Sequence, residues 1–460
     1  MTVIALADER RDELAGRFGG VLVGPGDSTY DALRACHNGL IDKRPALLAS
    51  CRGTADVAEA VRFAVAEGLE LAVRGGGHNV SGRAVCDGGL VIDLSLMRGV
   101  DVDPESRTAR VQGGALWSDV NRETAVHGLA VTGGAVSTTG VGGLTLGGGL
   151  GWLMGLYGLA ADNLLEAEVV LATGEVVRAR PDSHEDLFWA LRGGGGNFGV
   201  VTSFVFQLHP LAEVVGGLVA HPIDAAGDML RFYRDFTADV PDDLTIFAGL
   251  VHAPDGSGMP LAALVICHAG PRERALQEVQ PLVTWGTPAM VEVGPMPYPA
   301  INGMLDDGFP AGSLNYWKST FVRGIEDGLV DTMVERFASC PSPMGAILFE
   351  HFHGAVTRVG REETAVPHRA TGYNLLIPEV WMDPATTDAN IAWTRETYDA
   401  FAPYRADGRW LNYFGDDEAP NELDAAYGPN RGRLAEVKRR YDPDNVFHLN
   451  QNIVPAVVPA

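Results

Sequence analysis

The sequence predicts an α+β protein built from two domains, and three observations support this prediction. The chain has 460 residues, which is too long for one ordinary core, so we expect two domains of roughly 200 residues each. Its first half contains a β-α-β pattern followed by clustered glycines, which is typical of a backbone that approaches a ligand closely. From about Val214 the glycine runs stop and long strands alternate with amphipathic helices, which predicts one sheet covered by helices on one face.

The β-α-β pattern lies near the N-terminus. Residues 46–50 form an apolar strand, Thr54 is placed to cap the following helix, and Gly68 is placed to end it. A second strand at 69–73 leads directly into Arg-Gly-Gly-Gly-His at 74–78, the edge where open α/β sheets meet ligands. Further elements are expected as strands at 89–94, 107–112 and 200–208, helices at 116–127 and 185–191, and a hairpin of 166–171 with 175–179.

Glycine dominates the segment between Thr132 and Gly151. It contains nine glycines, and we expect neither a regular helix nor a central strand there. A second run, Gly193 to Gly196, leads into the strand at 200–208. It contains a formal G-x-G-x-x-G match that follows a helix and enters a strand, which is the wrong order for a dinucleotide-binding turn.

The second half is expected to hold strands at 244–252, 261–268 and 346–353 and an amphipathic helix at 272–285. The last fifty residues change character again. We expect a short strand at 410–413 and a helix at 431–440. Alternation along that strand would place Tyr413 on the same face as Leu411.

Charge and cysteine content exclude several classes of protein. The chain carries 35 basic and 59 acidic side chains, a formal charge of -24, which disfavours binding to nucleic acid or to an anionic membrane surface. The five cysteines are scattered without a C-x-x-C pair, so neither a disulfide framework nor a zinc site is predicted. No signal peptide and no apolar stretch of spanning length is visible, so a cytoplasmic location is the expectation.

The turn Gly75 to Gly77 has two interpretations of equal weight. It could place backbone N–H groups against phosphate, or it could be a tight turn that needs positive φ. His78 follows immediately, and a lone histidine there is usually a capping or hydrogen-bonding residue.

Five motifs in their order along the chain change that interpretation, because together they resemble the berberine-bridge-enzyme-like group of the vanillyl-alcohol-oxidase flavoprotein superfamily, with its PCMH-type FAD-binding domain. The resemblance covers nearly the whole chain. Its carriers are RGGGHN at 74–79, GVGG at 140–143, YGLAADN at 157–163, DLFWALRGGGGNFG at 186–199, and a C-terminal match of Asn412-Tyr413 with YDPDN at 441–445 through Asn452.

The resemblance implies a two-domain fold with a C-terminal return. Residues 1–212 would form the PCMH-type FAD-binding domain, 213–409 an α+β substrate domain, and 410–460 a segment that returns to the FAD domain. His78 would bond covalently to the flavin 8α-methyl, and neutral imidazole is a competent nucleophile for that step. The other cofactor-binding residues would be Arg74, Gly75, Gly76, Gly77, Asn79, Gly140, Gly142, Gly143, Asn163, Gly199, Val201, Asn450 and Asn452.

Two further positions distinguish this chain within the family. Many relatives carry a second flavin link from a cysteine four residues before the Gly-Val-Gly-Gly motif, and Val136 stands there, so a single 8α-histidyl bond is expected. Thr139 occupies the position at which the family admits or screens dioxygen beside the flavin, although it could also be a plain loop threonine.

The implied activity is FAD-dependent oxidation of a small organic substrate, an alcohol, sugar, amine or polyketide intermediate. Tyr413 would be the base, hydride would pass to flavin N5, and dioxygen would reoxidise the flavin to give hydrogen peroxide. A tyrosine has a pKa near ~10, so it needs a neighbouring positive charge or donor, which Arg358, His351 or His353 could supply. The alternatives are a dehydrogenase with another acceptor and a flavin-binding protein without catalysis. His351 and His353 lack a convincing third ligand, so no metal is predicted, and an oligomer is possible.

Overall fold

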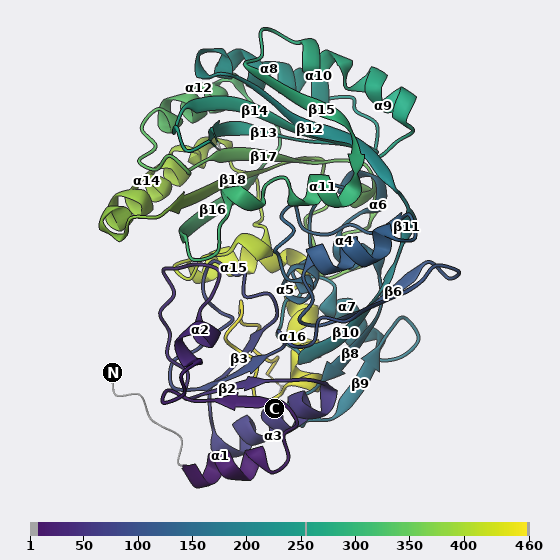
Figure 1. The fold of residues 1–460 in the computed structure, drawn as a ribbon, viewed down its shortest axis with the longest axis vertical. Helices are drawn as coiled ribbons and strands as arrows, with labels where there is room; N and C mark the ends of the chain where they lie inside the picture. The colour runs from purple at the N-terminus through teal and green to yellow at the C-terminus, as the bar shows by residue number, and fades with distance from the viewer. Residues whose placement is uncertain (1–7, 254, 458–460) are drawn as a thin grey trace.

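The computed structural model describes residues 8–253 and 255–457 and divides into two bodies (Figure 1). The lower body in Figure 1 contains both termini and three small sheets. The upper body is one seven-stranded sheet beneath a layer of helices. The chain passes from the first body to the second between β11 (His209–Pro210), which pairs with β7 (Leu129–Ala130), and β12 (Glu213–Pro222). The α+β fold with a helix-covered second sheet is as predicted from the sequence.

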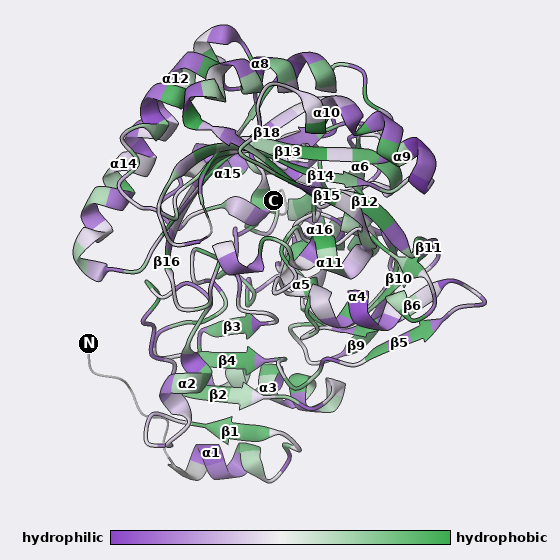
Figure 2. Ribbon diagram, turned by 45° about the horizontal axis from the view of Figure 1, so that its top comes forward, coloured by the Kyte–Doolittle hydropathy of each residue, from purple (hydrophilic) through white to green (hydrophobic). Residues whose placement is uncertain are grey.

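The β-α-β pattern forms the base of the first body. Strands β2, β4 and β3 are parallel, with β3 at the edge. Their mainly green colour in Figure 2 reflects three apolar residues in each strand, followed by Ser50, Asp93 or Arg74 at its end. Helix α3 begins at Thr54 with Gly53 as its N-cap, and Thr54 Oγ1 donates to Glu168 instead of capping. Gly68 ends the helix in the left-handed conformation, as expected. The elements are α1 Asp8–Ala15, β1 Val21–Val23, α2 Tyr30–Arg34, β2 Leu47–Ser50, α3 Thr54–Glu67, β3 Leu71–Arg74 and β4 Leu90–Asp93.

A five-stranded antiparallel sheet, ordered β5-β6-β10-β8-β9, completes the first body. The predicted hairpin forms between β8 and β9, and helix α7 has the predicted bounds. Strand β5, which the sequence interpretation missed, pairs with β6 at the sheet edge. The elements are β5 Val100–Asp103, β6 Thr108–Gln112, α4 Trp117–Ala125, β8 Leu164–Val170, β9 Val176–Ala179, α7 Glu185–Leu191 and β10 Val200–Gln207.

The glycine-rich segment contains a helix, so the expectation that no helix forms there was wrong. Helix α5 covers Val141–Leu146 and is followed by the short α6 (Met154–Tyr157). Val141 and Leu146 are buried in the core of the first body, and this packing offsets the low helix propensity of the glycines between them.

The second body is the seven-stranded sheet ordered β15-β12-β14-β13-β17-β18-β16. Side chains of α8, α9, α10, α12 and α14 share one core with the sheet on its outer face, and the inner face looks toward the first body. The helix expected at 272–285 is two helices, because Pro281 lacks an N–H and a second helix begins beside it. The elements are α8 Ala226–Thr237, β13 Leu244–His252, β14 Pro260–His268, α9 Arg272–Glu278, α10 Gln280–Thr284, β15 Met290–Pro297, α11 Tyr298–Gly303, β16 Leu314–Val322, α12 Asp327–Phe337, β17 Ile347–Phe352, α13 Ala355–Arg358, β18 Gly372–Trp381 and α14 Thr387–Ala400.

The C-terminal segment packs back into the first body. Leu411, Phe414, Tyr427 and Leu434 belong to its main core, and helices α15 (Pro420–Tyr427) and α16 (Arg431–Tyr441) lie there in yellow in Figure 1. The strand expected at 410–413 was wrong. These residues form a 3₁₀ turn in which Tyr413 N donates to Trp410 O, because no neighbouring strand is paired with them.

Among the described residues, no helix is both long and apolar enough to span a bilayer.

Candidate active site

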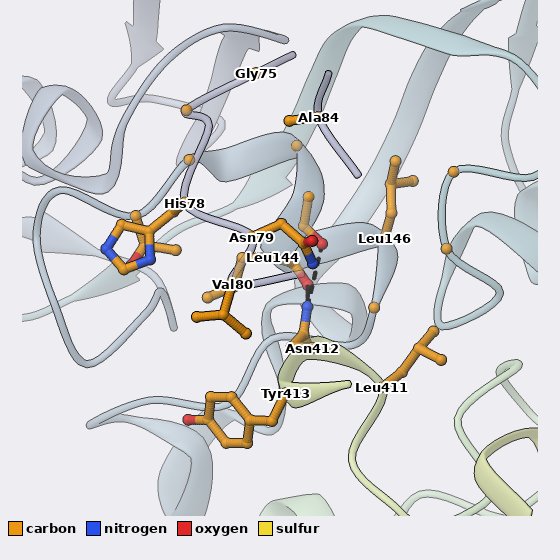
Figure 3. Close-up of a pocket in the computed structure, with 18 of the residues that line it drawn as sticks. Gly75, His78, Asn79, Val80, Ala84, Leu144, Leu146, Leu411, Asn412 and Tyr413 are labelled. Carbon is orange, nitrogen blue, oxygen red and sulfur yellow. Dashed lines mark hydrogen bonds between the residues drawn. The ribbon is translucent and has the colours of Figure 1, made fainter. Parts of the chain in front are cut away.

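A cavity lies between the two bodies and is lined by both of them (Figure 3). The turn after β3, the segment containing α5 and the start of β10 supply mostly bare backbone, with glycines at 75, 76, 77, 140, 142, 143, 195, 196 and 199. The inner face of the second sheet supplies side chains, and the 3₁₀ turn at 411–413 closes one side. The cavity therefore joins a backbone surface to a side-chain surface, which suits a large cofactor on one side and a substrate on the other.

The two glycine segments meet backbone to backbone. A Cβ on Gly76 would lie 2.5 Å from Gly140 Cα, and one on Gly140 would lie 2.5 Å from Gly76 N. Gly77 has φ of +67°, which an L side chain rarely adopts. The turn therefore needs positive φ at Gly77, and it also presents bare backbone to the cavity.

His78 follows this turn and is one of the residues that line the cavity (Figure 3). Its ring stacks on His37, with centroids 3.9 Å apart and planes inclined by 22°, and its Nε2 lies 3.4 Å from Thr138 Oγ1. Burial and the neighbouring His37 lower the pKa of His78 to about 3. The ring is therefore neutral at pH 7 and keeps a nitrogen lone pair, the form that a nucleophile requires.

His37 lies behind His78, outside the cavity lining, and sequence reasoning missed this contact. It is 9% exposed, burial lowers its pKa, and its Nε2 is buried without a hydrogen-bond partner within the described residues. It reaches His78 because Arg74, paired with Asp93, also donates to the carbonyls of Leu33 and Ala35 and so fixes the preceding loop. No local pattern links two histidines 41 positions apart, so the sequence held no signal for this contact.

Most of the predicted site residues line the cavity. Val136 and Thr139 line it near His78, and the following residues line it as well: Gly75, Gly76, Gly77, Asn79, Gly140, Gly142, Gly143, Gly199, Val201, Asn450 and Tyr413. Three predicted residues lie outside the lining. Arg74 fixes the loop that contains Leu33 and Ala35. Asn163 donates to the carbonyls of Tyr157 and Leu159. Asn452 follows Asn450 and Gln451, which do line the cavity.

Two asparagines of the C-terminal segment tie it to the glycine backbone. Asn412 Nδ2 donates to the carbonyls of Gly143 and Leu144 at 3.1 and 3.2 Å, as the dashed lines in Figure 3 show. Its Oδ1 is buried without a partner among the described residues, so it is an acceptor free for a ligand N–H. Asn450 Nδ2 donates to Gly196 O at 3.0 Å. Glycine backbone that a Cβ would fill, together with an orphaned acceptor, fits the expected FAD.

Tyr413 contacts a carboxyl group instead of a positive charge. Its hydroxyl donates to Glu350 Oε1 at 2.8 Å, and Asn374 Nδ2 donates to Oε2 of the same carboxylate at 2.7 Å. Burial raises the pKa of Glu350 to about 7, although both donors lower it. Burial and the adjacent Glu350 raise the pKa of Tyr413 well above 10, which is opposite to the direction that a phenolate base needs.

Glu350 was also missed from the sequence, although a signal existed. In β17 it follows three apolar residues and directly precedes His351. Alternation along the strand places its side chain on the face opposite His351, toward the cavity. His351 instead stacks on Tyr373 on the outer side, and its ring also stacks on His353 at 4.5 Å. Neither histidine assists Tyr413. Arg358 pairs with Asp242 at the surface.

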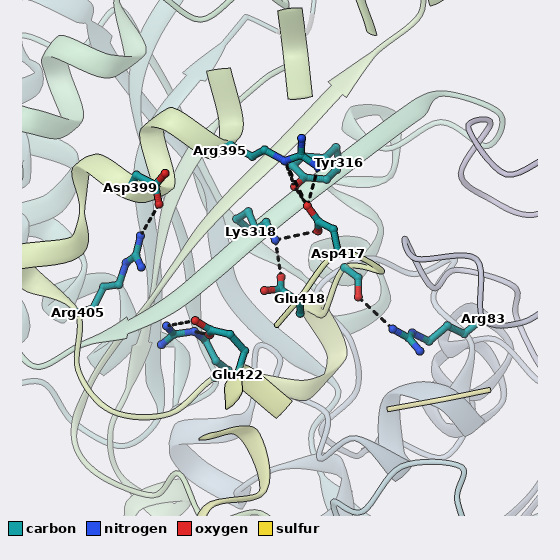
Figure 4. A network of polar contacts seen from close by, with 11 residues as sticks. Arg83, Tyr316, Lys318, Arg395, Asp399, Arg405, Asp417, Glu418 and Glu422 are labelled. Atoms are coloured by element: carbon teal, nitrogen blue, oxygen red, sulfur yellow. Dashed lines mark hydrogen bonds and ion pairs between the residues drawn. The ribbon is translucent and has the colours of Figure 1, made fainter. Parts of the chain in front are cut away.

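An ionic cluster, which we call the clasp, holds the segment beyond Tyr413 against edge strand β16 (Figure 4). Lys318 Nζ contacts Asp417 Oδ1 at 2.9 Å and Glu418 Oε1 at 2.8 Å. Asp417 also accepts from the Tyr316 hydroxyl and pairs with Arg395. The clasp thereby fixes the residues that follow Tyr413 to the second body.

One group of three potential metal ligands exists in the described part of the chain: Asp243, His268 and Glu278. Arg274 forms ion pairs with Asp243 and Glu278, so both carboxylates already have a cation. His268 Nδ1 accepts from the Gly270 N–H, and its Nε2 contacts Glu278 at 2.6 Å. Hydrogen bonds and ion pairs account for all three side chains.

Comparison with known proteins agrees with this geometry. Residues 45–180 match the family model of the FAD binding domain, and residues 410–454 match that of berberine and berberine-like proteins. The chain is 33% identical to (R)-6-hydroxynicotine oxidase of Paenarthrobacter nicotinovorans over 95% of this chain and 97% of that one. It is 31% identical to the FAD-linked oxidoreductase pgmH of Aspergillus terreus, over 98% and 97%.

Solved structures show the same fold. The structure of 6-hydroxy-D-nicotine oxidase from Arthrobacter nicotinovorans superposes with a TM-score of 0.86 at 30% identity, covering 95% of this chain and 98% of that chain. Chitooligosaccharide oxidase matches with a TM-score of 0.84 at 23% identity, over 97% and 100%, which shows the shared fold alone. With relatives above 30% identity along nearly its whole length, the chain belongs to the berberine-bridge-enzyme-like FAD-dependent oxidoreductases of the vanillyl-alcohol-oxidase superfamily.

Proposed function

We propose that the protein is an oxidase that holds FAD through a single covalent bond to His78 and oxidises a small organic substrate at the cavity between the two bodies. The observation that carries the proposal is that this cavity brings a neutral histidine, a glycine backbone surface and a buried proton acceptor into one space. FAD bound there would accept hydride at N5 and pass the electrons to dioxygen, giving hydrogen peroxide.

The residues divide the remaining work. Gly75 to Gly77 and Gly140 to Gly143 would approach the cofactor with bare backbone, and Asn412 Oδ1 would accept from it. Glu350, whose pKa burial raises to about 7, takes the substrate proton, and Tyr413 orients its carboxylate by hydrogen bonding. The base that we expected at Tyr413 is thus reassigned to the carboxyl that Tyr413 contacts.

The covalent bond is tested by acid denaturation. Flavin should remain with the precipitated polypeptide in the wild-type protein and stay in the supernatant for His78→Ala, as read from absorbance near 450 nm of the two fractions, which is roughly the oxidised-flavin maximum. Since Val136 stands where many relatives carry the cysteine of a second link, a peptide map should show one flavinylated peptide. Flavin released from the denatured wild type would overturn the proposal, and a second flavinylated peptide would overturn the single link.

Reoxidation separates oxidase from dehydrogenase. Thr139 is a small side chain in the lining near His78, which supports access for dioxygen. The reduced protein mixed with air-saturated buffer should return to the oxidised spectrum within the turnover time and release hydrogen peroxide. Slow return in air with fast return to an artificial acceptor would assign a dehydrogenase.

A further inference from the structure

We propose that residues 307–311, which we call the flap, cover the cavity and must open before a substrate can enter. The inference rests on the reaction proposed at this cavity and concerns the route by which a substrate reaches it. The flap lies in the connection that leads from α11 to β16. Three observations support the inference: the cavity wall is thin at the flap, few contacts hold the flap, and both of its ends are anchored.

The cavity wall is a single chain segment thick at the flap. Leu305 and Phe309 line the cavity, while Asp307, Gly308 and Ala311 of the same segment are exposed to solvent. The other walls are thicker, since the helix layer backs the seven-stranded sheet and the core of the first body backs the glycine segments. Displacing the flap would therefore connect the cavity directly with solvent.

Few contacts hold the flap in place. In the portion of the chain that the structure describes, the hydrogen bonds of 307–311 run only to immediate neighbours along the chain. Phe309 packs edge to face on Trp317, with ring centroids 5.4 Å apart. A segment with so few contacts opens at a low cost in free energy. The turn that carries Tyr413 differs, because the clasp fixes the residues that follow it.

Both ends of the flap are anchored to the first body. Before it, Asp306 accepts hydrogen bonds from the Ser137 N–H at 2.8 Å and from the Ser137 hydroxyl at 2.6 Å. After it, the Gly312 N–H donates to the carbonyl of His37 at 2.8 Å. Gly312 has φ of +86°, and a Cβ on Gly308 or on Gly312 would meet nothing within 4 Å. Fixed ends, two glycines and open space around them favour a hinged motion of the flap.

The kinetics of ligand binding to the flavin-loaded protein test the flap. The probe is 2-naphthol, a neutral two-ring phenol that suits an apolar lining and perturbs the flavin spectrum when it binds beside the flavin. If the flap limits both entry and exit, Phe309→Ala should raise the association and dissociation rates together, by about fivefold or more. Stopped-flow absorbance measures both rates. An unchanged association rate in Phe309→Ala would overturn the inference.

Leu348→Ala is the matched control for Phe309→Ala. Leu348 packs in the same apolar cluster and lines the same cavity, but it lies on β17 and not on the flap. Its replacement should raise the dissociation rate of 2-naphthol and leave the association rate as in the wild type. An equal rise of the association rate in both variants would mean that cavity volume, and not the flap, controls entry, which would overturn the inference.

The anchor and the backbone of the flap give two further measurements. Asp306→Ala removes both hydrogen bonds to Ser137 and should raise the association rate severalfold. Asp306→Asn keeps an acceptor for the Ser137 N–H and should restore most of the wild-type rate. In hydrogen exchange followed by mass spectrometry, the amides of 307–311 should exchange at least about tenfold faster than those of β16. Exchange as slow as in β16 would show that the flap stays closed, and would overturn the inference.

Dioxygen distinguishes access through the flap from a change at the flavin itself. A diatomic molecule needs a smaller opening than a two-ring probe, so reoxidation of the photoreduced flavin by dioxygen should proceed equally fast in Phe309→Ala and in the wild type. A change in this rate as large as the change in association would show that Phe309 acts on the flavin surroundings, and would overturn the inference. A protein that retains no flavin would instead contradict the proposed function, so the two failures are distinguishable.

Discussion

At the scale of single residues, burial decides which group of the Tyr413–Glu350 pair can take a proton. Taking a charge out of water raises the pKa of both acids, but a phenol starts near 10 and a carboxyl near 4.5. The shift brings the carboxyl of Glu350 to about 7 and moves the phenol of Tyr413 further from neutrality. The shared proton therefore stays on the tyrosine oxygen, and the carboxylate remains free to accept another.

Glu350→Gln should slow anaerobic flavin reduction by ~10²–10⁴-fold, the usual cost of removing a general base. In the wild type the rate should rise as the pH passes through about 7, because Glu350 becomes ionised there. The glutamine variant should lose this dependence. Stopped-flow absorbance between pH 5.5 and 9 checks both statements, with flavin content as the control for folding. An unchanged pH profile in the variant would assign the ionisation to another group.

Tyr413→Phe should have a smaller effect on the rate and a specific effect on the pH profile. The hydroxyl of Tyr413 lowers the pKa of Glu350 by donating to it. Removing that donor should raise the pKa of Glu350, so the rising limb of the profile should move to higher pH. A loss of rate as large as in Glu350→Gln, with the limb gone, would return the role of base to Tyr413.

His37 should affect formation of the covalent bond more than use of the finished enzyme. Its ring stacks on His78 and has no other partner for Nε2 within the described residues, so it sets the orientation of the His78 ring. We expect His37→Ala to slow covalent attachment of added FAD severalfold, and His37→Phe, which keeps an aromatic ring, to slow it less. Flavin fluorescence of the denatured polypeptide on a gel, followed with time, measures this. Equal rates in all three proteins would show that the stack is only packing.

At the scale of elements, the clasp explains how a short C-terminal turn without strand pairing keeps its place. Tyr413 lies in a single 3₁₀ turn, and its anchors are contacts of its neighbours: Asn412 to the glycine backbone on one side and Asp417 and Glu418 to Lys318 on the other. Burial lowers the pKa of Lys318, but the hydrogen-bonded carboxylates outweigh it and hold that pKa above its usual range. The lysine is therefore charged throughout the ordinary pH range.

Lys318→Met should lower the free energy of unfolding by about 1–3 kcal/mol. Removing one partner of a buried ion pair costs more than this, but Asp417 and Glu418 keep partial access to water, which reduces the penalty. The loop at 415–419 should also become more sensitive to limited proteolysis. Urea denaturation gives the first quantity. Arg122→Gln, which breaks an exposed ion pair with Glu123, is the matched control and should change little.

At the scale of the whole molecule, the elements predicted well are those whose pattern is local. Helix α7 and strand β13 have the expected bounds because each carries its own period of apolar residues. The turn at 410–413 and helix α5 depart from expectation because packing from elsewhere decides them. The same limit applies to the site. Glu350 and Tyr413 are 63 positions apart, and only the closure of the second sheet over the C-terminal segment brings them together.

A buried carboxyl outside the cavity should make the stability of the whole molecule depend on pH. Glu379, on β18, is 0% exposed and contacts Cys340 Sγ at 3.5 Å, and burial raises its pKa from 4.5 to about 8. Below 4.5 the group is protonated in both the folded and the unfolded chain. Between 4.5 and 8 the unfolded chain releases the proton and the folded chain keeps it, so the unfolding free energy falls by up to roughly 1.4 kcal/mol per pH unit.

Glu379→Gln should therefore be close to the wild type in stability near pH 4 and exceed it at pH 8, because an amide stays uncharged at both values. Urea denaturation of both proteins at the two pH values measures the difference. Glu105→Gln, at an exposed position, controls for the loss of one charge from a chain of net charge -24 and should show the same small effect at both pH values. If the Glu379→Gln difference were independent of pH, Glu379 would be ionised in the folded protein, and its burial would have to be offset by a cation.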